Sequence, residues 1–215
     1  MLQALLKTFP LSLVAAVSPV LIIFEIVVLS GKSKSILKTW FYVFGAGIVL
    51  LVIGVLELLV FRNLSLRPAT PDNFSAYLDF IFAILLVWLL FRRPHKSTNK
   101  PKRKLPNSYY AYFALGAGLM MVNVSSLIPY LAMIKLLGET SITTIEKIQV
   151  LLLNIALILL PLIIPLLYCS IFSKSANKFL GALSSFTKRY SSIITKVLLV
   201  AIIIYLIWHG ISQLQ

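Results

Sequence analysis

The feature that most limits how this chain can fold is a succession of long apolar runs. A membrane-spanning helix needs roughly 20 mostly apolar residues. Six segments meet that requirement, at about 4–29, 39–61, 75–91, 109–137, 148–172 and 193–212. Only 12% of the 215 residues are charged, whereas soluble domains carry roughly 25%. We therefore predict an all-α, polytopic membrane protein with six transmembrane helices.

The charged residues are distributed unevenly along the chain. Fifteen of the 20 Lys and Arg residues follow the first, third and fifth apolar runs. Cytoplasmic loops carry such an excess, so both termini are expected outside the cytoplasm. The net charge of +14 is accordingly attributed to topology and to anionic lipid headgroups at the cytoplasmic face, with no role in binding nucleic acid. No cleavable signal is evident, and the first run is predicted to be the first span.

A basic stretch at 92–108 contains three prolines among Lys, Ser, Thr and Asn. This composition is typical of a solvated linker. It divides the chain into a first half, 1–91, and a second half, 109–215, with three spans each. Three spans reverse the orientation of the second half, so any relation between the halves must be an inverted-topology repeat.

Two of the predicted spans are interrupted at a similar depth. In the first, Pro19 follows Ser18, and a proline inside a helix removes a backbone donor and kinks or opens the helix. In the fourth, the interruption is a group of polar residues next to an aromatic one: Asn123, Ser125, Ser126 and Tyr130. Paired interruptions are the best sequence pointer to the central site of a transporter. We predict that helices one and four are broken and that these residues lie on the transport path. A simple proline kink, with the Ser18 hydroxyl bonded back to its own helix, is the alternative for the first interruption. For Asn123, Ser125 and Ser126 the alternative is that they only join neighbouring helices by hydrogen bonds.

Glu25 follows the first interruption and lies four residues before Leu29, the end of the apolar run. It is therefore about 6 Å inside the cytoplasmic boundary at 1.5 Å per residue. Ionisable groups at membrane depth are functional by default, and Glu25 is predicted to gate the path or to couple it to protons. Asn154 in the fifth span is predicted to line the path, or else to satisfy a carbonyl freed by Pro161.

Other polar and aromatic residues favour structural roles. Glu57 is predicted to form an interfacial ion pair with Arg62. Lys135 is predicted to anchor the outer end of span four, or else to contact an anion. Belts at the membrane interfaces are predicted for Trp40, Tyr42, Tyr109, Tyr110, Tyr112 and Trp208. No nucleophile–base pair, nucleotide-binding loop or metal-ligand spacing occurs, and Cys169 is the only cysteine. We predict no catalytic residue, metal or cofactor.

The first interruption carries a family resemblance. Ala16-Val17-Ser18-Pro19-Val20-Leu21-Ile22 resembles the opening of the GAP family, the sulfolipid-1-addressing (Sap) and glycolipid-addressing proteins of the lysine exporter (LysE) superfamily. The run from Gln149 to Asn154 and the closing Ile207-Trp208-His209-Gly210-Ile211 are similar too. The resemblance implies a six-helix carrier of the prokaryotic inner membrane, with Ser18-Pro19 as its first broken element and Asn154 as a matching polar position.

The resemblance also implies a function in glycolipid export. We predict an integral membrane transporter that exports or flips a lipid or glycolipid. Amino-acid exporters of the superfamily show Asn-Pro in span four, where this chain has Asn123-Val124. The missing proline favours the lipid-addressing branch over amino-acid export. Export of an amino acid or cation is the alternative, as is a non-transporting scaffold for glycolipid export. The expected partners are membrane lipids and the lipid cargo, with a homodimer left open.

Overall fold

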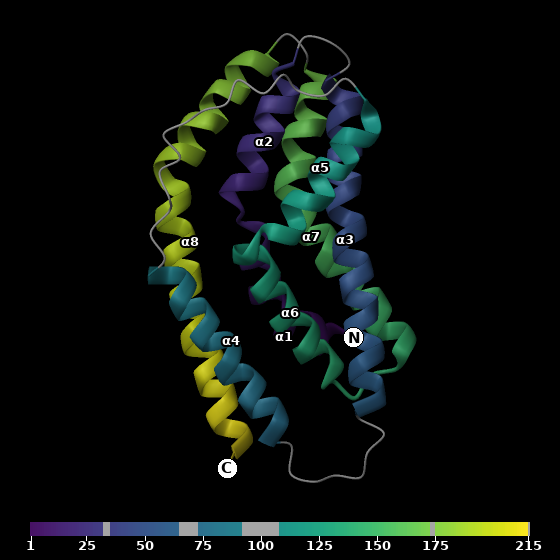
Figure 1. Ribbon diagram of the computed structural model, residues 1–215, viewed down its shortest axis with the longest axis vertical. Coiled ribbons are helices and arrows are strands. Elements are labelled where there is room, and N and C mark those ends of the chain that lie inside the picture. Colours follow the sequence, from purple (N-terminus) through teal and green to yellow (C-terminus); the bar gives the residue numbers. More distant parts are fainter. Residues whose placement is uncertain (32–34, 65–72, 92–107, 173–174, 215) are drawn as a thin grey trace.

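The computed structural model describes residues 1–31, 35–64, 73–91, 108–172 and 175–214, and within these residues all regular structure is helical. Figure 1 shows the helices running along the long axis of the molecule. They are α1 (Leu2–Ala16), α2 (Pro19–Leu29), α3 (Ser35–Leu64), α4 (Asn73–Phe91), α5 (Tyr109–Val122), α6 (Val124–Gly138), α7 (Thr144–Ile171) and α8 (Ala176–Leu214). The prediction of an all-α membrane protein is confirmed at this level.

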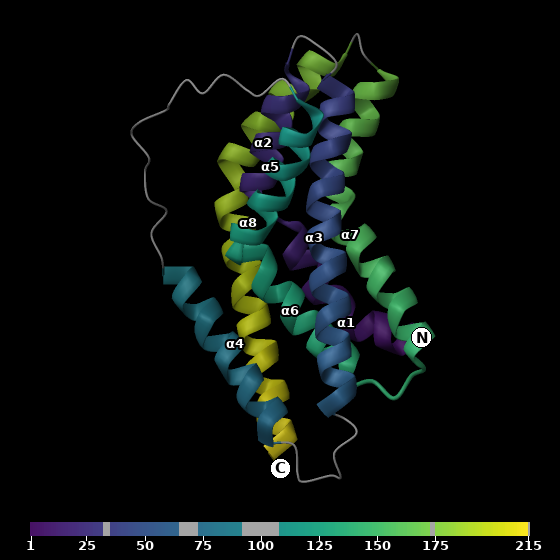
Figure 2. The same cartoon turned by 45° about the vertical axis from the view of Figure 1, so that its right-hand side comes forward.

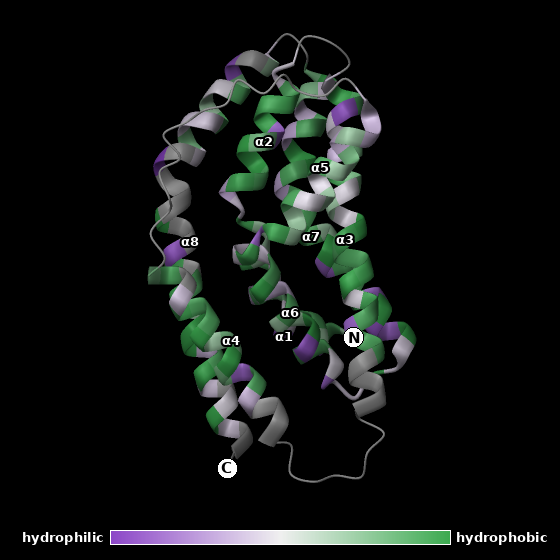
Figure 3. Cartoon of the chain, viewed as in Figure 1, coloured by the Kyte–Doolittle hydropathy of each residue, from purple (hydrophilic) through white to green (hydrophobic). Residues whose placement is uncertain are grey.

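Helix length and composition identify two to four candidate membrane spans among the described residues. Helix α7 and the segment Ser35–Leu59 of α3 are each long and apolar enough alone. The pairs α1–α2 and α5–α6 qualify only as bent spans, with angles of 56° and 72° at their breaks. Helices α4 and α8 hold shorter apolar stretches, Tyr77–Trp88 and Leu199–Ser212. Figure 3 shows the apolar character of these helices. The six-span arrangement stays a prediction.

Helix α6 is the central helix of the fold. Nearly all of its residues from Ser126 to Gly138 are buried, and it contacts α1, α3, α4 and α7. Figures 1 and 2 show it enclosed by the longer helices. Side chains on a helix surrounded on all sides have no contact with bulk solvent, so any polar group on α6 must find a partner within the protein.

Two glycines allow α3 and α5 to cross closely. A Cβ atom added at Gly45 would collide with the Phe113 carbonyl, and one added at Gly116 would collide with the Tyr42 carbonyl. Small residues at such positions let membrane helices approach backbone to backbone. At this crossing, α3 from the first half packs against α5 from the second half.

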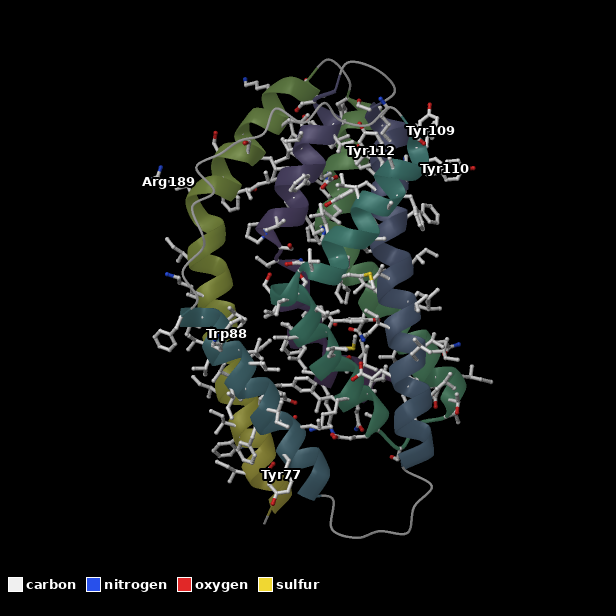
Figure 4. All side chains as sticks on the ribbon, in the orientation of Figure 1. Tyr77, Trp88, Tyr109, Tyr110, Tyr112 and Arg189 are labelled. Carbon is white, nitrogen blue, oxygen red and sulfur yellow. The ribbon has the colours of Figure 1, made fainter. Side chains whose placement is uncertain are left out.

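Two sequence predictions about the surface need correction. The basic segment after the fifth run was expected to be a loop, but α8 is helical from Ala176 onward, because no proline interrupts this segment. The predicted linker 92–108 lies outside the described residues except for Ser108. Tyr110 and Trp208 are exposed as an interfacial belt requires, whereas Tyr42 and Tyr112 are buried and belong to the core. Figure 4 shows Tyr109, Tyr110 and Tyr112 at the same end of the molecule.

Candidate transport site

The first break separates α1 from α2 at Val17 and Ser18. Pro19 occupies the first turn of α2, where its missing N–H is not needed. Ser18 has extended backbone angles (φ −114°, ψ 103°) and acts as the N-cap, its hydroxyl oxygen accepting from the Leu21 N–H at 3.4 Å. The helix is therefore interrupted at this point, and a simple proline kink does not describe the interruption.

The second break falls at Asn123, between α5 and α6, and it forms without a proline. Asn123 has non-helical backbone angles (φ −82°, ψ 73°). Its carbonyl nevertheless accepts from the Ser126 and Leu127 N–H groups, each at 3.0 Å, which starts α6. Asn side chains compete locally with helical hydrogen bonding, so they favour helix ends. The only proline of this span, Pro129, lies inside α6.

The two breaks are joined directly by side chains. The Asn123 Nδ2 group donates to Ser18 Oγ at 2.7 Å and to Ser126 Oγ at 2.8 Å, and Ser125 Oγ donates to Asn123 Oδ1 at 2.8 Å. Ser18 is 1% exposed and Asn123 is 7% exposed. The structure thus brings four of the predicted site residues into one buried network, which we call the central network (Ser18, Asn123, Ser125, Ser126).

Asn154 belongs to a second network between α1 and α7. Its Nδ2 group donates to Thr8 Oγ1 at 3.0 Å and to the Val150 carbonyl at 2.9 Å, and Ser12 Oγ donates to its Oδ1 at 2.7 Å. All three side chains of this network are fully buried. The hypothesis that Asn154 satisfies a carbonyl freed by Pro161 is wrong, because its amide is used by α1 and by Val150. Sequence reasoning did not include Thr8 and Ser12, although both are polar residues in the first apolar run.

Glu25 lies on α2, two turns beyond the central network. Its side chain is 0% exposed, and within the described residues neither carboxylate oxygen has a hydrogen-bond partner. Tyr42 of α3 and Cys169 of α7 lie close enough for the carboxylate to act on them electrostatically. The Tyr42 hydroxyl itself donates to the Leu21 carbonyl at 3.1 Å. A buried carboxylate without a partner is costly, which singles Glu25 out from the satisfied groups around it.

The C-terminal half of α6 carries a charged cluster that the sequence analysis missed. Lys135 is fully buried, and its Nζ atom lies 2.6 Å from Asp79 Oδ1 on α4, in charge contact although the angle is poor for a hydrogen bond. It also lies 3.3 Å from Oε1 of Glu139, the C-cap residue of α6 four positions further on. The prediction that Lys135 is an interfacial anchor is therefore wrong. The signal was Asp79, the one acidic residue inside the third apolar run, which we did not pair with Lys135.

The remaining predicted residues have structural contacts. The buried Tyr130 hydroxyl donates to the Leu50 carbonyl of α3, so its hydrogen bond lies outside the central network. Glu57 is partly exposed and acts electrostatically on Tyr130. Its predicted partner, Arg62, has a side chain outside the described part of the structure. Among the described residues, no cluster of three His, Cys, Asp or Glu side chains could hold a metal ion.

Buried polar networks on broken apolar helices define this chain as an α-helical integral membrane protein with a polar site in its interior. The particular family follows from comparison with known proteins. Residues 9–212 match the family model of Sap, the sulfolipid-1-addressing protein, and the chain belongs to this family. Neither the curated proteins nor the solved structures include a match. The resemblance of the first interruption to the Sap proteins is thereby confirmed.

Proposed function

We propose that the chain is a transporter that moves a lipid or glycolipid out of the inner leaflet of a prokaryotic cytoplasmic membrane. The family description, sulfolipid-1-addressing, supports a role in lipid export. The observation that carries the proposal is the hydrogen bond between the two breaks, from Asn123 to Ser18 at 2.7 Å. Broken helices that meet inside the membrane offer backbone and side-chain polar groups to a substrate, which continuous helices do not.

The buried polar groups are spaced along a path that would lead a headgroup across the bilayer. Along α2, Glu25 is seven residues from Ser18, and along α6, Lys135 is twelve residues from Asn123. At 1.5 Å per residue these helical paths add to roughly 28 Å, close to the roughly 30 Å thickness of the hydrocarbon core. The central network would contact the headgroup at mid-membrane, and Glu25 would gate the path at its cytoplasmic end.

Helix packing supports an inverted repeat as the basis of this mechanism. Helix α5 packs on α3, and α1 packs on α7, so the first segment of each half contacts the long helix of the other half. Each half begins with a broken helix pair, and the two breaks meet. In the proposed mechanism one half rocks against the other around this meeting point. The placement within the lysine exporter superfamily and the outside location of both termini belong to the same proposal.

Reconstitution of the purified chain into vesicles tests the proposal. The probes are a phospholipid and a glycolipid, each with a dithionite-sensitive fluorescent headgroup label, and the readout is movement between leaflets. We expect movement with the wild-type chain, a loss of about tenfold or more with Ser18→Ala and Asn123→Ala, and slowed movement with Glu25→Gln. Ser185→Ala is the matched control, because Ser185 is an exposed serine of α8 whose hydroxyl donates to the Gly181 carbonyl.

The outcomes separate the alternatives. If Ser18→Ala and Glu25→Gln both leave movement at the wild-type rate, the mechanism through the central network is wrong. If the wild-type chain moves no lipid but co-purifies with stoichiometric partners of glycolipid synthesis or export, the scaffold alternative replaces the transporter. If it moves a labelled amino acid and no lipid, the small-solute alternative holds.

A further inference from the structure

The buried cluster of Asp79, Lys135 and Glu139 joins the two halves of the chain away from the central network. Asp79 and Lys135 are both 0% exposed, while the Glu139 side chain is 27% exposed. Asp79 comes from α4 in the first half, Lys135 comes from α6 in the second half, and Glu139 is the C-cap residue that follows α6. Ionisable groups at such depth in a membrane protein mark ion pathways, proton relays or substrate contacts.

A polar cavity at the surface touches this cluster at one residue, Glu139. It has a volume of about 440 Å³ and lies between the start of α1 and the connection from α6 to α7. Glu139 belongs to its wall, as do Lys7, Thr140 and Ser141. Figure 1 shows the N-terminus and the connection from α6 to α7 in the lower half of the view and α2 in the upper half. The charge pattern assigns the lower end to the outside. Glu139 is therefore in contact with the cavity on one side and with buried Lys135 on the other.

The other titratable groups near the cluster are either electrostatically coupled to it or held elsewhere. Tyr205 of α8 senses the charges of Asp79 and Glu139, and Lys7 of α1 lines the cavity. On α7, Lys147 donates to the Gly138 carbonyl at 2.5 Å. Glu146 is hydrogen-bonded to Thr143 in a capping box and lies 3.9 Å from the ammonium of Met1, which also lines the cavity. On α3, Glu57 acts on Tyr130. None of these groups separates Glu139 from the cavity.

We propose that Asp79, Lys135 and Glu139 form the site at which the transporter takes up a proton from the outer aqueous phase. This inference rests on the proposed transport function. A proton enters through the cavity, binds a carboxylate oxygen of Glu139 and passes to Asp79. Neutral Asp79 no longer holds Lys135, whose ammonium stays charged and pairs with the Glu139 carboxylate. The link between α4 and α6 is thereby released, and deprotonation of Asp79 restores it.

The composition of the cluster favours a proton over a metal cation as its ligand. Both carboxylates lie within charge contact of the Lys135 ammonium, which occupies the position that a metal cation would need. A proton needs only one carboxylate oxygen. Glu139, four residues after Lys135, is an alternative partner for its ammonium. Release from Asp79 therefore does not leave a buried ammonium without a counter-ion.

Accessibility of a buried cysteine tests the release step without measuring transport. The reporter is Ala132→Cys, a fully buried position one turn before Lys135, in a Cys169→Ala background. Spheroplasts are treated with a membrane-impermeant maleimide at external pH 5.5 and 8, and rates are normalised to those of exposed Ser141→Cys. We expect at least fivefold faster normalised labelling at pH 5.5. Asp79→Asn should label rapidly at both pH values.

Two further variants keep the test decisive. Glu139→Gln, a change at a partly exposed residue, should label slowly at both pH values because the proton route is interrupted. Glu146→Gln changes a carboxylate at the same end outside the cluster and should keep the wild-type pH dependence. The inference is overturned if the parent protein shows no pH dependence, or if Glu139→Gln and Asp79→Asn retain it.

Transport measurements then separate the inference from the proposed function. With the outside of the vesicles acidified, wild-type lipid movement should accelerate, and Glu139→Gln should lose this acceleration. A wild-type chain that moves no lipid removes the proposed function, while the labelling result still decides whether the cluster takes up protons. A wild-type chain that moves lipid, combined with unchanged acceleration in Glu139→Gln, removes only the inference.

Discussion

At the scale of single residues, the polar groups of this membrane protein fall into satisfied and unsatisfied classes. Asn123 and Asn154 each use both ends of their side-chain amide in hydrogen bonds. Glu25 is buried with no hydrogen-bond partner among the described residues. A satisfied amide fixes one arrangement of the helices, whereas an isolated carboxyl group leaves its site open to a second arrangement or to a ligand.

The ion pair of Lys135 and Asp79 makes a strong prediction about stability. Lys135→Met leaves Asp79 buried without its ammonium partner, so the free energy of unfolding should fall by about 3–5 kcal/mol. The double variant Lys135→Met with Asp79→Leu removes both charges and should recover most of that loss. Equilibrium unfolding in mixed detergent micelles, followed by circular dichroism, measures the difference. A double variant as unstable as Lys135→Met alone would contradict this account.

The sequence predicted those features that depend on a single apolar run. Ser18-Pro19 and the polar run from Asn123 are visible as interruptions of apolar runs, and both are breaks in the structure. The pairing of Lys135 with Asp79 needs the tertiary arrangement, since the two residues are 56 positions apart and approach only because α4 packs against α6. For the same reason the hydrogen bonds that join Asn154 with Thr8 and with Ser12 could not be predicted from the sequence.

At the scale of elements, the two breaks reach the same result by different local chemistry. Pro19 prevents α1 from continuing, and Ser18 caps the helix that follows. Asn123 ends α5 and starts α6 without a side-chain cap and without a proline. The missing proline at position 124 therefore does not prevent a break, and the Asn123 side chain is used to join the two breaks.

The crossing of α3 and α5 predicts a sharp contrast between glycines of one helix. Gly116→Ala places a methyl group against the Tyr42 backbone, and such overpacking should cost about 1–3 kcal/mol. Gly118 has no atom within 4 Å of an added Cβ, so Gly118→Ala should gain about 0.5–1 kcal/mol from its higher helix propensity. Unfolding of the two variants in the same micelles provides the comparison. Equal effects would mean that α3 and α5 do not cross at these glycines.

At the scale of the whole molecule, charge and packing together predict its orientation in the membrane. Ser141 is exposed in the connection between α6 and α7, and Ser185 is exposed in the basic part of α8. In a Cys169→Ala background, Ser141→Cys should react with an impermeant thiol reagent added outside spheroplasts. Ser185→Cys should react only after the membrane is opened. The reverse pattern would overturn the assignment of the basic segments to the cytoplasm.

Helix α8 is much longer than the hydrocarbon core of a bilayer is thick. Its 39 residues extend about 58 Å, nearly twice the hydrocarbon thickness of roughly 30 Å. Lys178 and Arg189 are exposed in its first half and Lys196 just beyond its middle, and Figure 4 shows Arg189 pointing away from the other helices. Near its other end, a Cβ added at Gly210 would lie 3.4 Å from the Asp79 Cβ atom. Helix α8 thus joins an exposed basic segment to the contact with buried Asp79, and we expect a change in bilayer thickness or in inner-leaflet charge to tilt α8 and to shift Asp79.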